Sequence, residues 1–98
     1  MTQAEIQALS EKIAPIAEKY GVERVKLFGS RARGDNRPDS DYDFLIGMGK
    51  IRSLIQLCGF ELELEDILHT HVDVITDTCN DPKFVFNAEN EGLLVYGY

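Results

Sequence analysis

The chain has 98 residues, of which 44% are hydrophobic and 28% are charged, and its net charge at pH 7 is −7. This composition is typical of a single folded domain, here residues 1–98, and it excludes a disordered chain. The negative charge argues against direct nucleic-acid binding, because a phosphate backbone would be repelled.

The first predicted element is a helix that ends near residue 20. Thr2 and Glu5 have the spacing of a capping box, and apolar residues recur behind them at helical intervals. Pro15 lies inside this run and removes one backbone N–H donor, so the sequence predicts a bend or a break there. Gly21 is expected to end the helix.

Two strands are expected next, on either side of a loop. Residues 22–28 alternate between apolar and polar side chains, which predicts a strand. Residues 29–40 are rich in Gly, Pro, Asn and Asp, which predicts a loop with a short helix over residues 30–33. Residues 41–48 have the pattern of the second strand.

The second half of the chain is expected to add two helices and two strands. Residues 51–68 follow helical spacing, although "ELELE" also alternates with a period of two; Leu and Glu favour the helix. Residues 71–76 predict a third strand, residues 81–90 a helix that begins at Asp-Pro, and residues 92–98 a last strand. This order indicates an α/β or α+β domain, with one sheet of about four strands and flanking helices.

Basic side chains gather in one part of this acidic chain. Half of the ten basic residues fall between positions 24 and 37, namely Arg24, Lys26, Arg31, Arg33 and Arg37. A local basic patch on an acidic protein fits a small anionic ligand better than a long polyanion.

Two common ligand-binding loops do not fit this region. Gly29 and Gly34 have the spacing of a phosphate-binding P-loop, but Asp35 stands where that loop needs lysine. A calcium-binding EF-hand loop starting at Asp39 would need glycine at the position of Phe44 and an acid at its twelfth position, which is lysine.

A two-metal nucleotidyl-transfer site fits better. On a strand, Asp41 and Asp43 point to the same face, with Cα atoms ~6.5–7 Å apart. Their carboxylates could converge on two Mg²⁺ ions, which in such sites lie ~3.5–4 Å apart. Asp73 is a candidate third carboxylate, because it lies on a predicted neighbouring strand with an apolar valine on each side.

The turn before these aspartates supplies groups that bind anions. The Gly29–Ser30 turn offers backbone N–H donors and a hydroxyl to a triphosphate. Arg31 and Arg33 could donate charge-assisted hydrogen bonds to phosphate oxygens. Each feature alone has an ordinary explanation, since the loop could be a solvated turn and Asp73 a charge at a strand edge. Their combination favours a site of chemistry.

Several other polar side chains are interpreted as structural. His69 and His71 lie near Asp73, where a metal site is an alternative, but two histidines between a helix and a strand are more often surface or capping residues. The acidic side chains in the predicted second helix are interpreted as a solvated face, with contact to a basic partner as the alternative: Glu61, Glu63, Glu65 and Asp66.

Nothing in the sequence predicts secretion or membrane insertion. The first residues lack the apolar run of a signal peptide, and no apolar segment approaches the ~20 residues that span a bilayer. Cys58 and Cys79 form no CxxC pair and are too few for a disulfide framework, so we expect reduced thiols in a cytoplasmic protein.

The motifs "GSRARG", "SDYDF" and "HVDVI" together resemble the minimal nucleotidyltransferase (MNT) branch of the DNA polymerase β-like nucleotidyltransferase superfamily. The likeness covers nearly the whole chain. It implies the nucleotidyltransferase fold and Mg²⁺-dependent transfer of a nucleoside monophosphate from an NTP to a hydroxyl. It also implies that Gly29 and Ser30 bind the triphosphate, that Asp41 and Asp43 bind two metal ions, and that Asp73 is the third carboxylate.

The resemblance also implies a partner. Many proteins of this kind are encoded beside a HEPN-domain toxin and act as its antitoxin, transferring AMP from ATP to a tyrosine of the toxin. Two alternatives stay open: a module that neutralises its partner by binding alone, and the catalytic subunit of a small-molecule nucleotidyltransferase. The intact set of three acids favours the enzyme, because convergent carboxylates repel one another unless a metal is bound.

Overall fold

The computed structural model describes residues 2–76, 83 and 92–97, and its elements follow the predicted order. They are α1 (Gln3–Tyr20), β1 (Arg24–Phe28), α2 (Gly29–Arg33), β2 (Tyr42–Gly47), α3 (Leu54–Leu68), β3 (Val72–Thr76) and β4 (Leu93–Tyr96). The helix predicted over residues 81–90 and the thiol of Cys79 lie outside the described residues.

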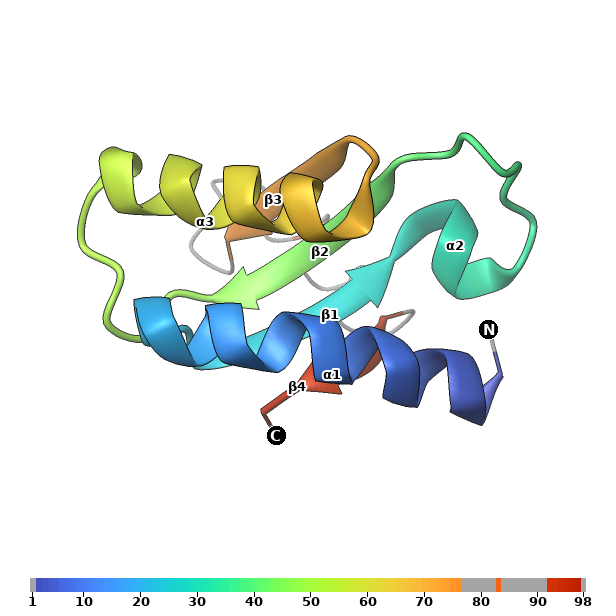
Figure 1. Cartoon of the computed structure of the whole chain (residues 1–98), viewed down its shortest axis with the longest axis horizontal. Coiled ribbons are helices and arrows are strands. Elements are labelled where there is room, and N and C mark those ends of the chain that lie inside the picture. Colours follow the sequence, from blue (N-terminus) through green and yellow to red (C-terminus); the bar gives the residue numbers. More distant parts are fainter. Residues whose placement is uncertain (1, 77–82, 84–91, 98) are drawn as a thin grey trace.

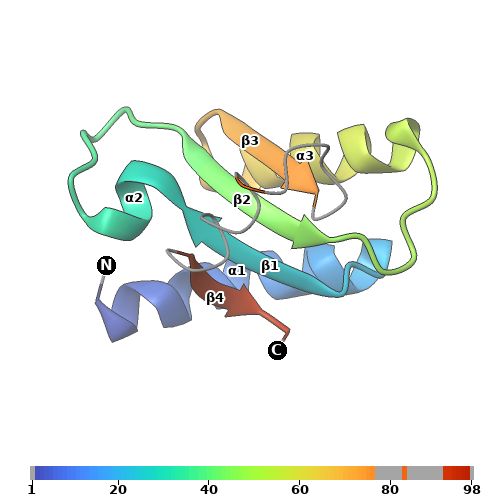
Figure 2. The same cartoon turned by 180° about the vertical axis from the view of Figure 1, so that it is seen from behind.

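The strands form one mixed sheet in the order β3-β2-β1-β4. β1 pairs antiparallel with β2 and with β4, whereas β2 pairs parallel with β3 through the crossover helix α3. Helices α1 and α3 lie side by side over one face of the sheet (Figure 1), and the opposite face is seen from behind (Figure 2). The predicted four-stranded mixed sheet with flanking helices is confirmed.

Helix α1 begins at the predicted capping box and continues unbroken through Pro15. Thr2 accepts a hydrogen bond from the backbone N–H of Glu5 and the Glu5 side chain bonds back, so two N-terminal donors are satisfied. The break predicted as one outcome at Pro15 does not occur. Pro15 is exposed, so the carbonyl of Glu11 that loses its helical partner lies on the solvent side of the helix and can be hydrated.

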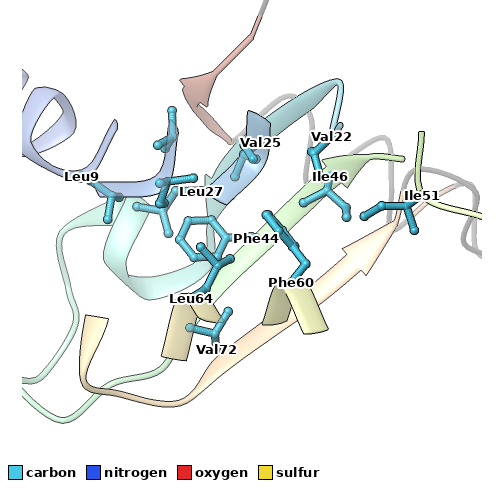
Figure 3. Close-up of a cluster of buried hydrophobic side chains, with 13 residues drawn as sticks. Leu9, Val22, Val25, Leu27, Phe44, Ile46, Ile51, Phe60, Leu64 and Val72 are labelled. Carbon is cyan, nitrogen blue, oxygen red and sulfur yellow. The ribbon is translucent and has the colours of Figure 1, made fainter. Parts of the chain in front are cut away.

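The core lies between the sheet and the two long helices (Figure 3). Val25 and Leu27 of β1, and Phe44 of β2, are fully buried and point towards this side. Phe60 and Leu64 of α3 pack on them, so the alternating "ELELE" stretch is helical, as predicted. Because strand side chains alternate, the residue before Phe44 must face the other side of the sheet.

None of the helices in the described ranges combines the length and the hydropathy needed to span a membrane.

Ser53 caps the N terminus of α3, and His69 ends this helix in the left-handed conformation at φ 56°. Cys58, on its surface, is an exposed free thiol.

Candidate active site

Two aspartates at the start of β2 and a third on β3 meet on the sheet face opposite the helices. Asp43 lies on β2 and is the register partner of Asp73 on the parallel strand β3, so both side chains share a face. Asp41 lies one residue before β2 begins. The side chain of Tyr42 between them packs against the core, as the predicted alternation requires.

The carboxylates crowd one another. The pKa of Asp43 is raised above its ordinary value, first by burial, then by repulsion from Asp73 and a hydrogen bond with it, and then by Asp41. Arg33 opposes this effect. A bound cation would relieve the repulsion, since positive charge favours the ionised form of each acid.

Glycine is required at position 29 for two reasons. Gly29 has φ +77°, a conformation that other residues adopt only with strain, and a Cβ there would lie 2.5 Å from Oδ2 of Asp43. The turn therefore touches the carboxylate. Phe28 supplies no side-chain cap to α2, while the Ser30 carbonyl accepts hydrogen bonds from the N–H groups of Gly34 and Asp35.

The two candidate phosphate-binding arginines have different surroundings. Arg31 donates from Nε and Nη2 to the carbonyl of Ser40, at 2.9 and 2.7 Å, and its guanidinium lies 4.0 Å from the centroid of the Tyr42 ring. Arg31 therefore holds the segment around Asp41, at the start of β2, against α2. Arg33 is exposed and pairs with Asp35 at 3.3 Å. Its charge reaches Asp43, as the effect on the pKa of that acid shows.

His71 belongs to the site, although the sequence interpretation treated both histidines as ordinary surface or capping residues. That interpretation holds for His69, which ends α3. His71 Nε2 lies 3.1 Å from Asp73 Oδ1, and His71 Nδ1 lies 2.8 Å from Glu65 Oε2. The hydrogen bond with Asp73, and then the charge of Asp41, raise the pKa of His71 against the opposing effect of burial. The spacing of His71 and Asp73 repeats that of Asp41 and Asp43, which is a signal that could have found it.

The acidic run of α3 is not simply a solvated face, which corrects a second expectation. Glu65 accepts hydrogen bonds from His71 and from the backbone N–H of Val72. Glu63 bonds with Lys19 at 3.0 Å and with the Tyr20 hydroxyl, and so ties α3 to α1. Both acids accept hydrogen bonds from neighbouring elements, which periodicity within one helix cannot reveal.

The residues present fit a divalent metal ion. Asp41, His71 and Asp73 each offer a ligand atom, and these atoms lie within 4.8 Å of one another. Carboxylate oxygens are the ligands that Mg²⁺ prefers. Asp43, which bonds with Asp73, adds a fourth group beside them.

A cavity of about 400 Å³ is separate from the aspartates. Its lining is shared by the start of α1 and the loop after α2: Thr2, Glu5, Ala8, Leu9, Lys12, Arg31, Gly34, Asn36, Tyr42 and Leu68. None of the three aspartates contributes to it. The exposure of Asp41 and Asp73 agrees with a site on an open face, where a large second molecule could reach the carboxylates.

Residues 11–98 match the family model described as "Polymerase beta, Nucleotidyltransferase". A relative from Methanocaldococcus jannaschii named "putative protein adenylyltransferase" is 42% identical over 90% of this chain and 95% of its own length. Another, from Thermococcus cleftensis and named "protein adenylyltransferase MntA", is 34% identical over 76% of this chain and 77% of its own.

Solved structures agree with the fold. A structure described as a minimal nucleotidyltransferase has a TM-score of 0.79 and 30% identity, covering 95% of each chain. A toxin–antitoxin structure with AMP-PNP has a TM-score of 0.78 at 19% identity, covering 91% of this chain and 73% of that one. A complex of a tri-AMPylated Shewanella oneidensis HEPN toxin with its MNT antitoxin has a TM-score of 0.72 at 17% identity, covering 95% and 73%. At such low identity, the last two show a shared fold.

Proposed function

The chain belongs to the polymerase β nucleotidyltransferase family, and from this premise we propose that it transfers AMP from ATP to a hydroxyl of a HEPN-domain toxin, as that toxin's antitoxin. The observation that carries the proposal is the meeting of Asp41, Asp43 and Asp73 beside the Gly29 turn. A degenerate relative would have no reason to keep three mutually repelling carboxylates at one place.

Relatives and structural neighbours support the choice of acceptor. Two relatives carry names that describe transfer of AMP to protein, and one neighbour is a HEPN toxin bearing three AMP groups. The open position of the aspartates suits a protein acceptor, because a folded partner could present its own side chain to them. We propose a tyrosine hydroxyl as the acceptor.

In the proposed reaction, the acceptor oxygen attacks the α-phosphorus of ATP. A bond forms between that oxygen and phosphorus, the bond from the α-phosphorus to its bridging oxygen breaks, and pyrophosphate leaves. The hydroxyl proton passes to a carboxylate of the cluster and then to water. Reactions of this type depend chiefly on holding the reactants in line and on neutralising charge.

The aspartates and the Gly29 turn have different roles in this reaction. Asp41, Asp43 and Asp73 would hold two Mg²⁺ ions, which supply charge neutralisation at the phosphates when bound. Gly29 lets the turn approach Asp43, so its backbone and that of Ser30 can bind the triphosphate close to the carboxylates.

The two arginines have different roles at the site. Arg31 has two of its nitrogens occupied by the loop and acts mainly by positioning Asp41. Arg33, whose charge already acts on Asp43, is the better phosphate ligand.

The test is the mass of the partner. The protein is incubated with a HEPN-domain protein as the candidate partner, ATP and Mg²⁺, and the partner's intact mass is measured. One or more added AMP groups, located on tyrosine by peptide mass spectrometry, are expected. Asp41→Asn should prevent the addition, whereas Asp39→Asn, in the same exposed loop but outside the cluster, should not.

Two other results would separate the alternatives. If Asp41→Asn still neutralises the toxin and leaves its mass unchanged, the protein acts by binding alone. If AMP is transferred to a small molecule while the partner stays unmodified, the partner is not the substrate, and the chain is a small-molecule nucleotidyltransferase.

A further inference from the structure

The metal-binding set contains an imidazole that the three-aspartate pattern does not include. Nε2 of His71 lies 3.1 Å from Oδ1 of Asp73. Asp41, His71 and Asp73 each offer one ligand atom, and these three atoms lie within 4.8 Å of one another. Ligand atoms about 2.1 Å from one octahedral metal ion lie about 3 Å from each other, so this separation suits two neighbours in one coordination sphere. The sequence positions agree with this arrangement, because residues two positions apart in extended chain, such as His71 and Asp73, point to the same side.

Glu65 holds the imidazole in the orientation that a metal ligand needs. One oxygen of Glu65, Oε2, lies 2.8 Å from Nδ1 of His71 and accepts the backbone N–H of Val72 at 3.0 Å. An ionised carboxylate only accepts hydrogen bonds, so without a metal each ring nitrogen can donate to the acid that it faces, Nδ1 to Glu65 and Nε2 to Asp73. Glu65 can keep the hydrogen on Nδ1 when a metal ion takes the place of the hydrogen on Nε2.

A carboxylate that orients a histidine in this way is the usual support of a histidine metal ligand. The Val72 N–H fixes Glu65 to the first residue of β3, which directly precedes Asp73 and directly follows His71. The orienting acid is therefore held at the start of the strand where His71 and Asp73 lie.

We propose that His71 is a nitrogen ligand of the metal ion bound at Asp41 and Asp73, with Glu65 as its positioning residue. The inference rests on the proposed function, since it concerns the same metal site. An imidazole strengthens binding of first-row transition ions such as Co²⁺ more than binding of Mg²⁺, which strongly prefers oxygen. The site is therefore selective for a transition ion, beyond what its carboxylates alone would give.

The chain offers a matched control, because His69 is its only other histidine. His69 is exposed, ends α3 with φ 56°, and is absent from the described group of metal-ligating side chains. Asn tolerates this left-handed conformation better than most residues, so His69→Asn removes the second imidazole with little strain. Any imidazole signal from a bound metal must come from one of these two side chains.

The test uses the full chain with Mn²⁺ as a paramagnetic probe. Pulsed electron paramagnetic resonance is expected to show nitrogen coupling of imidazole type in the wild-type protein and in His69→Asn. The coupling should disappear in His71→Ala and in His71→Gln, a second variant suited to this half-exposed position. Circular dichroism checks that each variant is folded.

Affinity gives a second measurement. Calorimetric titration is expected to show that His71→Ala weakens Co²⁺ binding by about tenfold or more, and Glu65→Gln by about tenfold with the nitrogen coupling kept. Binding of Mg²⁺ should change by less than about threefold in the same variants.

The outcomes separate this inference from the proposed function. Bound Mn²⁺ without nitrogen coupling, or coupling that persists in both His71 variants, overturns the inference and leaves the carboxylate site intact. A wild-type protein that binds no Mn²⁺, or binds it as well after Asp41→Asn, overturns the metal site of the proposed function as well.

Discussion

Asp43→Asn is expected to abolish nucleotidyl transfer and yet to stabilise the metal-free protein. Burial and the neighbouring acids raise the pKa of Asp43, which means that its ionised form is disfavoured in the folded state. Asn has the same shape without the charge, so the variant keeps the contact with Gly29 and loses the repulsion. Most substitutions of a residue that supports the fold lower its stability instead.

The size of the gain follows from the sheet. Asp43 and Asp73 are register partners on neighbouring strands, which lie ~4.8 Å apart. Two like unit charges about 5 Å apart repel by about 0.8 kcal/mol in water and about 3 kcal/mol at an effective dielectric constant of 20. The Asp73 side chain is 51% exposed, so the lower part of this range applies. We expect a gain of about 1 kcal/mol, or about 4–8 °C in Tm.

The assay is urea unfolding in EDTA, with Asp39→Asn as the control for loss of one exposed negative charge. Because the folded pKa of Asp43 is raised, the folded wild-type protein binds more protons than the unfolded chain between the ordinary and the raised pKa. Its stability therefore rises as pH falls through the folded pKa and becomes constant below the unfolded one. The advantage of Asp43→Asn should accordingly shrink in acid. If the variant is less stable than wild type at pH 7, Asp43 is a structural residue and the reasoning is wrong.

Three further predictions concern the turn, the metal and the loop. Gly29→Ala should lower the free energy of unfolding by about 1 kcal/mol or more in urea and abolish ATP binding, because φ is +77° and its Cβ would meet Asp43; normal ATP binding would show that the turn is not used. Calorimetry should show much tighter ATP binding in Mg²⁺ than in EDTA, since the carboxylates repel the triphosphate; equal affinity would contradict the metal site. Arg31→Lys should destabilise by about 1 kcal/mol in urea and slow transfer, because an ammonium group cannot reproduce the planar contacts with Ser40 and Tyr42; unchanged transfer rates would remove Arg31 from the positioning role.

The local pattern of the sequence was sufficient for the elements and for part of the site. Periods of 3.6 and 2 residues are set by neighbouring positions of one segment, so they place α3 and the strands without knowledge of the fold. The same period of two predicts that Asp41 and Asp43 share a face, since Tyr42 must face the core. Pro15 shows the limit of such rules, because the effect of one missing hydrogen bond depends on whether water can replace it.

The tertiary structure decided which side chains from different elements meet. The strand order places β3 beside β2, and the parallel pairing of these two strands sets Asp73 opposite Asp43. The roles of Arg31 and His71 depend on partners in other segments, the carbonyl of Ser40 and the carboxylate of Glu65. Hydrogen bonds of this kind act over about 3 Å and join different elements, so they depend on how the chain turns between those elements, which the period of a single helix or strand does not encode.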